Sequence, residues 1–249
     1  MTRTPASAAD AGTVLARAEA AYLGLALGDA LGATVEFMTP REIAHQHGVH
    51  REIVGGGWLK LKPGQITDDT SMSLALGAAI LAHDGRVVPL ACAEAFDDWM
   101  RQKPVDIGNT VRRNLITFRR TGSPVAPASE HDAGNGAAMR VLPAALATFA
   151  QAEAEVRAAV QAQAHVTHNS RVSDAVCEFL ALAVQDLLRG GTLRELLAQR
   201  IEPLLVAHPE LSFRHRPRRE NPGGWVVETL QAVLQALFHF LRPRRRVLG

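Results

Sequence analysis

The residues best suited to chemistry stand together in one short stretch, Thr67-Asp68-Asp69-Thr70, between a turn at Pro63-Gly64 and an apolar run. Adjacent carboxylates repel each other, so solvent, a helix dipole or a bound cation must compensate them. Two interpretations fit this spacing equally well. Thr67 or Asp68 caps the N-terminus of a helix while the next acid complements the dipole, or the carboxylate and hydroxyl oxygens bind a hard metal ion.

Two further loops add acids and amides at helix edges, where side chains from different helices can meet in one cleft. The loop from Gly28 to Met38 contains Asp29 and Glu36. Asp29 by itself is more often a structural hydrogen-bonding residue than a catalytic one. The loop from Pro104 to Thr110 places Asp106 three residues before Asn109, a spacing that fits either a functional carboxylate or an Asx cap.

Two more polar loops follow in the second half of the chain. Ser129 to Arg140 runs through Gly134-Asn135-Gly136 into a predicted helix. The glycines let backbone N–H groups approach a ligand and the helix N-terminus favours an anion, so a phosphate fits there. His165 and His168 could bind an anion, assist proton transfer or cap a helix end, and for a single histidine a structural role is the more common one.

Composition predicts an α-helical protein that must position these loops. Hydrophobic residues make up 47% of the 249, aromatic residues only 5%, and the abundant alanine and leucine favour helices over strands. No alternating pattern is long enough to predict a sheet, and Glu52 to Leu61 could form a short hairpin at most. Helical periodicity is present in nine segments: Val14 to Leu31, Thr70 to His83, Leu90 to Arg101, Val111 to Arg120, Ala137 to Ala150, Glu153 to His165, Ser173 to Leu188, Leu193 to Ala207 and Trp225 to Phe240.

Length and linkers favour a single domain over residues 1–249, with 1–12 as a flexible start and 241–249 as an atypical basic tail. Cys92 and Cys177 lie in apolar helical patterns, which indicates reduced core thiols and a cytoplasmic protein. We find no export signal and no run long enough to span a membrane. The arginines after residue 213 lack the interleaved aromatic residues of a single-strand binder, so we expect no nucleic-acid partner.

The polar loops also resemble a known family, the ADP-ribosylglycohydrolases. The similarity extends from Tyr22 to about Leu237 and rests on long, specific matches. They are Gly28-Asp29-Ala30-Leu31-Gly32-Ala33-Thr34-Val35-Glu36-Phe37-Met38, Gly55-Gly56-Gly57-Trp58-Leu59, Leu61-Lys62-Pro63-Gly64-Gln65-Ile66-Thr67-Asp68-Asp69-Thr70, Arg101 to Asn109, and Asp132 to Arg140.

The resemblance implies an all-α fold that binds two divalent metal ions, Mn²⁺ or Mg²⁺, and removes ADP-ribose from a protein arginine. In the most similar branch the substrate is the nitrogenase iron protein, and the resemblance suggests control by a PII-type signalling protein and an ammonium channel. A monomer is expected. By motif, the metal ligands are Thr67, Asp68 and Asp69, and the catalytic acids are Asp106 and Glu36. The substrate-binding residues are Asn109, Glu130, Asp132, Gly134, Asn135, Gly136 and His168.

The sequence departs from the family pattern near its C-terminus. The family supplies the other half of its metal site from a Gly-Gly-Asp-x-Asp-Thr segment after the helix that corresponds to Trp225 to Phe240, and this chain has no aspartate after Asp186. We therefore expect a C-terminally truncated or altered member. It is either a hydrolase with a reduced metal site or a catalytically impaired ADP-ribose-binding protein that lacks half of the dinuclear centre.

Overall fold

The computed structural model describes residues 11–214 and 221–241, with side chains described as far as 238. Within those residues the fold is all-α, as the composition predicts, and contains no β-strand. The elements in chain order are α1 (Ala11–Gly32), α2 (Pro40–His47), α3 (Asp68–Ala82), α4 (Pro89–Arg101), α5 (Asn109–Thr121), the 3₁₀ turn η1 (Asn135–Ala137), α6 (Leu142–Ala147), α7 (Glu153–Ala164), α8 (Arg171–Leu188), α9 (Leu193–Leu196), η2 (Leu197–Ile201), α10 (Glu202–Ala207), η3 (Pro209–Leu211) and α11 (Val226–Leu241).

Most predicted helices agree with the structure to within a few residues, because their apolar periodicity is strong. One prediction was wrong in extent: Ala137 to Ala150 is not one helix but the end of η1, a turn and the six-residue α6. The sequence analysis also missed α2. Thr39 stands directly before Pro40 and forms a capping box with Glu42, which is a sequence signal for a helix start. The predicted helix Leu193 to Ala207 is continuous but contains a π-helical turn, η2.

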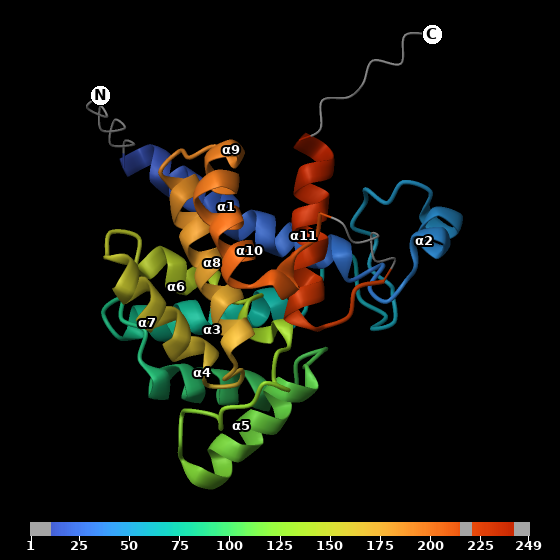
Figure 1. Cartoon of the computed structure of the whole chain (residues 1–249). Helices are drawn as coiled ribbons and strands as arrows, with labels where there is room; N and C mark the ends of the chain where they lie inside the picture. Colours follow the sequence, from blue (N-terminus) through green and yellow to red (C-terminus); the bar gives the residue numbers. More distant parts are fainter. Residues whose placement is uncertain (1–10, 215–220, 242–249) are drawn as a thin grey trace, which may run out of the picture.

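Two apolar clusters hold the helices together. The larger is built mainly on α8, which packs against α6, α7 and α11, and the smaller lies between α3, α4 and α5. Helix α3 also packs against α1 and α6, so its N-terminus is held between elements distant in the chain. Helix α2 lies at the edge of the molecule, apart from this bundle (Figure 1).

The segment predicted as a possible hairpin forms a single antiparallel bridge between Gly56 and Leu61. Its glycines allow a tight turn: Gly57 has φ +66°, and a Cβ there would lie 2.6 Å from the carbonyl oxygen of Ala33. Any other residue at this position would therefore push the turn away from the end of α1. This close approach brings Trp58, the next residue, to Glu36 in the turn that follows α1.

Other general expectations concern the thiols, membrane spans and chain ends. Cys92 and Cys177 are free and buried, which confirms the predicted core thiols. None of the described helices combines the length and apolar character that a membrane span requires. Of the segment 1–12, the structure describes only Ala11 and Gly12, which begin α1. The basic tail lies outside the described residues apart from Leu241, the last residue of α11.

Candidate functional site

Asp29, near the end of α1, organises the N-terminus of α3. Its carboxylate accepts hydrogen bonds from the backbone N–H groups of Thr67 and Thr70, at 2.9 and 3.2 Å from Oδ2. It also accepts the hydroxyl protons of Thr67, at 2.8 Å, and Thr70, at 2.6 Å. Thr67 is the N-cap residue of α3 by position, but its side chain makes no cap hydrogen bond. Asp29 therefore caps this helix from another element, which confirms its structural role.

Asp68 and Asp69 occupy the first turn of α3 and keep their carboxylates free of that capping network. Burial raises the pKa of Asp68 to about 6, and repulsion from Asp106, Glu36 and Asp29 adds to the effect. The pKa of Asp69 is raised to about 7. Burial is the largest cause, repulsion from Asp68 is the next, and repulsion from the other three acids adds to it. The five carboxylates thus form one electrostatically coupled acidic cluster, which a positive charge would stabilise.

Glu36 lies in the turn after α1 and faces the same cluster. Trp58 donates a 2.9 Å hydrogen bond from its indole N–H to Oε2 of Glu36. Burial is the main cause that raises the pKa of Glu36, the Trp58 hydrogen bond opposes it, and repulsion from Asp106 and Asp29 adds to it. The next residue, Phe37, has φ +62°, an uncommon conformation for a bulky residue. Its ring contacts Trp58 and its carbonyl accepts from Asn221, so both neighbours hold the turn in place.

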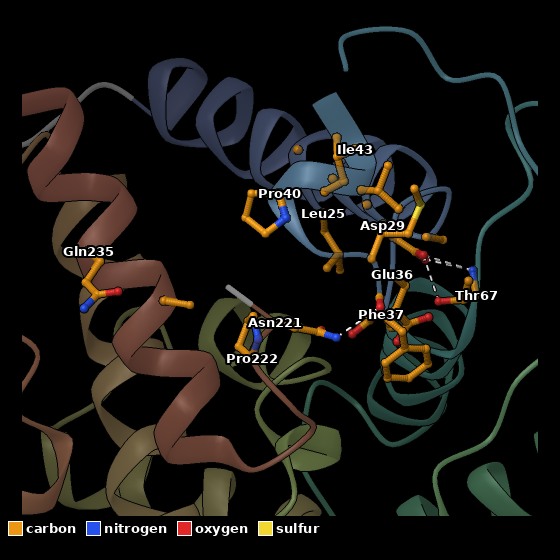
Figure 2. Close-up of a pocket in the computed structure, with 18 residues that line it drawn as sticks. Leu25, Asp29, Glu36, Phe37, Pro40, Ile43, Thr67, Asn221, Pro222 and Gln235 are labelled. Atoms are coloured by element: carbon orange, nitrogen blue, oxygen red, sulfur yellow. Dashed lines mark hydrogen bonds between the residues drawn. The ribbon is translucent and has the colours of Figure 1, made fainter. Parts of the chain in front are cut away.

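A cavity of about 670 Å³ lies beside these acids, a size that suits a small-molecule ligand. Asp29, Glu36, Thr67 and Asp69 line its polar side, whereas Leu25, Met38 and Ile43 contribute apolar surface. Figure 2 shows Asp29, Glu36 and Thr67 gathered on one side, with Gln235 of α11 across the opening. The structure therefore places three predicted site residues, Glu36, Thr67 and Asp69, on one cavity wall.

The acidic cluster fits a divalent cation in charge and in atom type, because hard cations bind carboxylate and hydroxyl oxygens. Burial and, after it, mutual repulsion raise the pKa values of Asp68 and Asp69, and a cation would stabilise the charged form of both. Its geometry is incomplete, however: in the part of the chain that the structure describes, no three His, Cys, Asp or Glu side chains converge closely enough to hold a metal ion. The described residues do not make a full coordination site.

Asp106 and Asn109 lie between α4 and α5. Asp106 is half-buried, its Oδ1 accepts from the N–H of Ile107 at 2.7 Å, and its charge acts on Asp68, Asp69 and Glu36. Asn109 is exposed as the first residue of α5, and the N-cap residue is Gly108, without a side-chain cap hydrogen bond. The Asx-cap interpretation therefore fails for Asn109, and Asp106 belongs with the acidic cluster.

The loop from Glu130 to Gly136 forms a second polar region. Asp132 is buried and forms an ion pair with Arg113 of α5, and it accepts a long hydrogen bond from Asn114 at 3.4 Å. Asn135 joins the loop to α11, because its side-chain amide donates to Thr229 at 3.2 Å and its N–H donates to Gly224. Glu130 is exposed. Asp132 and Asn135 thus fix the loop to two helices.

The glycines of this loop have a packing role that the sequence did not indicate. Gly136 enters a three-residue 3₁₀ turn, not a long helix, so the helix N-terminus expected to attract an anion is not present there. A Cβ at Gly136 would lie 2.8 Å from Cε1 of His168, and one at Gly134 would lie 3.0 Å from its Nε2. Both glycines make room for the buried imidazole.

The two histidines of the fourth loop have separate roles. His165 forms the C-cap of α7, and its Nε2 lies 2.8 Å from a carboxylate oxygen of Asp174 in α8. That contact is structural. His168 is buried against the glycine loop, and burial, with the charges of Arg140 and Arg113, lowers its pKa to about 3. His168 is therefore neutral at physiological pH, which excludes it as a cationic anion-binding group.

Sequence reasoning missed three residues that support these groups: Trp58, Arg113 and Arg140. Trp58 follows a triple-glycine turn and holds Glu36, whereas Arg113 pairs with Asp132. Arg140 is fully buried. Its only sequence signal is a charged residue inside an apolar stretch, Ala137 to Ala147, and such residues are rarely buried without specific partners.

These observations define an all-α protein with a cavity edged by coupled acids and a second, glycine-rich polar loop. The family model of the ADP-ribosylglycohydrolases matches residues 10–248, and the chain belongs to that family. The chain is 50% identical over 222 residues to the ADP-ribosyl-[dinitrogen reductase] glycohydrolase of Rhodospirillum rubrum, a match that covers 89% of this chain and 74% of that protein. The family is a hydrolase family and is generally metal-dependent.

More distant relatives agree with this assignment. The ADP-ribosylarginine hydrolase Tri1 of Pseudomonas putida is 33% identical over 96% of this chain and 64% of its own length. The corresponding protein of Serratia proteamaculans is 31% identical, over 90% of this chain and 63% of its own length. A solved structure described as an ADP-ribosylglycohydrolase-related protein complex superposes with a TM-score of 0.77 at 34% identity, covering 94% of this chain and 78% of that one.

We expect Gly136→Ala to destabilise the protein by about 1–3 kcal/mol, the usual cost of overpacking a buried site. The added methyl group would lie 2.8 Å from the His168 ring. Urea denaturation measures the effect. Gly24→Ala is the matched control, because Gly24 is helical with open space around it, and the same change there should be neutral or stabilise by about 0.5–1 kcal/mol. Equal stability of the two variants would contradict the close packing.

Proposed function

We propose that this chain hydrolyses the N-glycosidic bond between ADP-ribose and a protein arginine, and that its substrate is ADP-ribosylated dinitrogenase reductase. The relative from Rhodospirillum rubrum, which is 50% identical to this chain, is named for that activity. Two further relatives are named as ADP-ribosylarginine hydrolases. The observation that carries the proposal is the acidic cluster at the cavity, since hydrolysis at an anomeric carbon requires carboxylates for proton transfer and for stabilisation of positive charge.

Asp106 and Glu36 are the proposed catalytic residues. Cleavage breaks the bond between the anomeric carbon and the guanidine nitrogen, water supplies the new C–O bond, and the proton lost by water is balanced by the proton gained by the leaving guanidine. Glu36, whose pKa is raised mainly by burial, is the group proposed to exchange protons with water and the leaving guanidine. Asp106, whose charge acts on Glu36 within the same acidic cluster, stabilises the positive charge that develops on the sugar.

The second polar region is proposed to bind the ADP-ribose group. This proposal assigns that role to Asn109, Glu130, Asp132, Gly134, Asn135, Gly136 and His168. Because Asp132 is already paired with Arg113 and Asn135 is bonded to Thr229, we expect their contribution to be mainly the shape of the loop. The direct polar contacts would then come from exposed groups such as Asn109 and Glu130 and from the His168 ring.

For the metal, we propose that Thr67, Asp68 and Asp69 hold Mn²⁺ or Mg²⁺. The observations in favour are the oxygen donors and the raised pKa values of the two aspartates. Since the described residues do not complete a coordination shell, we assign no reaction step to the ion. Control by a PII-type protein and an ammonium channel, a monomeric state and a cytoplasmic location also stay predictions.

A second candidate function is a non-catalytic ADP-ribose-binding protein. The incomplete convergence of ligands around Thr67, Asp68 and Asp69 favours it, because the polar loop that would bind ADP-ribose does not depend on that cluster. Calorimetric titration with ADP-ribose, together with an activity assay, separates the two functions. Binding without turnover supports the second candidate.

We expect the purified 249-residue chain to release ADP-ribose from ADP-ribosylated dinitrogenase reductase in the presence of Mn²⁺, and Asp106→Asn to lower the rate by about 100-fold or more. Chromatographic measurement of free ADP-ribose tests this. Asp98→Asn serves as the matched control, because that exposed aspartate of α4 lies outside the acidic cluster and should leave the rate unchanged. If the wild-type chain releases nothing while the Rhodospirillum rubrum relative is active, the hydrolase proposal is wrong.

A further inference from the structure

Arg140 is fully buried, and in the described residues no carboxylate forms an ion pair with it. Its Nε donates to the side-chain oxygen of Gln163 at 2.9 Å, and its guanidinium carbon lies 4.1 Å from the ring centroid of Phe96. Its Nη1 lies 3.9 Å from the sulfur of Met72 in α3. Burying a cation is unfavourable unless neighbouring groups compensate its lost hydration through hydrogen bonds. The other hydrogen bonds of Arg140 are therefore the ones that explain its position.

The remaining nitrogen, Nη2, donates to the carbonyl of Gln163 at 3.0 Å and to Oγ1 of Thr167 at 2.8 Å. Thr167 is itself fully buried, and its Oγ1 lies 2.8 Å from Nδ1 of His168. A guanidinium has no acceptor atoms, so the direction of the first bond is certain: Arg140 donates and the threonine hydroxyl accepts.

That direction decides the second bond. The hydroxyl of Thr167 has one proton, and among the described residues Nδ1 of His168, 2.8 Å away, is the group placed to accept it. If Nδ1 carried a proton and donated it instead, the hydroxyl proton would be buried without an acceptor, which is the costly arrangement for a polar group. The favoured arrangement runs from Arg140 to Thr167 to Nδ1, and it leaves the imidazole proton on Nε2.

Nε2 of His168 lies on the side of the glycine loop, close to Gly134 and Gly136. In the part of the chain that the structure describes, no protein acceptor forms a hydrogen bond with it. The ring is also neutral, because burial and the two nearby arginines lower its pKa. His168 therefore presents a neutral N–H donor at a loop where the described residues offer it no acceptor.

We propose that Arg140 is a positioning residue, which acts through the hydroxyl of Thr167 to fix His168 in the tautomer protonated on Nε2. Within the proposed function, in which the His168 ring contacts ADP-ribose, this tautomer makes the ring a hydrogen-bond donor to the bound ligand. The second statement rests on the proposed ADP-ribose function, whereas the first does not.

The tautomer is tested by ¹⁵N NMR of the free protein labelled at histidine. His168→Gln identifies the resonances among the ten histidines of the chain. We expect a pyrrole-type Nε2 and a pyridine-type Nδ1 in the wild type and in Thr167→Ser, which keeps the hydroxyl. Thr167→Val, which has a similar shape without the hydroxyl, should lose this pattern and show mixed tautomers.

A second buried threonine provides the control. Thr148 donates its hydroxyl proton to the carbonyl of Ala144 and accepts from Gln185, outside the His168 network. Thr148→Val should affect stability much as Thr167→Val does, but leave the His168 resonances unchanged. A purely structural role for Thr167 predicts no difference between the two variants in the NMR pattern.

Binding of ADP-ribose by calorimetry tests the second statement. We expect Thr167→Val to weaken binding about 5-fold, the effect of one hydrogen bond, while Thr167→Ser and Thr148→Val bind as the wild type does. A protonated ring, the opposite tautomer, or an unchanged pattern in Thr167→Val would overturn the positioning role. If the wild type shows the stated tautomer but binds no ADP-ribose, the proposed function and its ligand are wrong. The positioning role of Arg140 and Thr167 would still stand.

Discussion

Asp29→Ala is expected to lower the free energy of unfolding by about 3 kcal/mol. The change would leave two backbone N–H groups and two hydroxyls, those of Thr67 and Thr70, without their acceptor at a buried helix end. Each buried donor left unpaired costs about 1–3 kcal/mol. Removal of one negative charge from the acidic cluster offsets part of this loss, but Asp29 is only a minor source of the repulsion on Asp68.

Urea denaturation at pH 7 measures this effect. Asp29→Asn, which keeps one acceptor oxygen, should lose about half as much. Thr39→Ala removes the exposed cap of α2 and should cost only about 0.5–1 kcal/mol, so it controls for helix capping in general. A loss at Asp29 no larger than that at Thr39 would show that Asp29 does not hold the N-terminus of α3.

Asp69→Asn is expected to stabilise the metal-free protein by about 1–2 kcal/mol at pH 8 and to abolish catalysis. The pKa of Asp69 is raised from 3.8 to about 7. A carboxyl whose folded pKa is raised favours the folded state below the unfolded value, near pH 4, and this advantage is lost as pH rises through the folded value near 7. The wild type therefore loses stability between about pH 4 and pH 7, and the neutral amide avoids that loss.

Thermal unfolding of wild type and Asp69→Asn across pH 4 to 8 tests this prediction. The gap between them should be small at pH 4 and largest at pH 8. Adding Mn²⁺ at pH 8 should stabilise the wild type and leave the variant unchanged, because the cation needs the carboxylate. Asp98→Asn, at an exposed position, should show no pH-dependent gap. A gap of constant size at every pH would mean that Asp69 is not responsible.

The sequence by itself determined the fold class and the positions of the acids. Apolar periodicity predicts helices well where it is long, as in α8, and it failed where a short helix follows an irregular turn, as at α6. The two adjacent aspartates at the start of α3 and the glutamate after α1 were visible as candidate site residues, because residue type and local turn chemistry are properties of neighbours in the chain.

Only the tertiary structure decided how those residues are used. The sequence left Thr67 and Asp68 open between a helix cap and a metal site, and the structure shows that the cap comes from Asp29, 38 residues earlier than Thr67. The glycines at 134 and 136 predicted a place for an anion, and the structure adds that they make room for His168, whose Nδ1 lies beside the Thr167 hydroxyl that Arg140 contacts. Hydrogen-bond partners and burial depend on helices that meet across the fold, so no local pattern in the sequence specifies them.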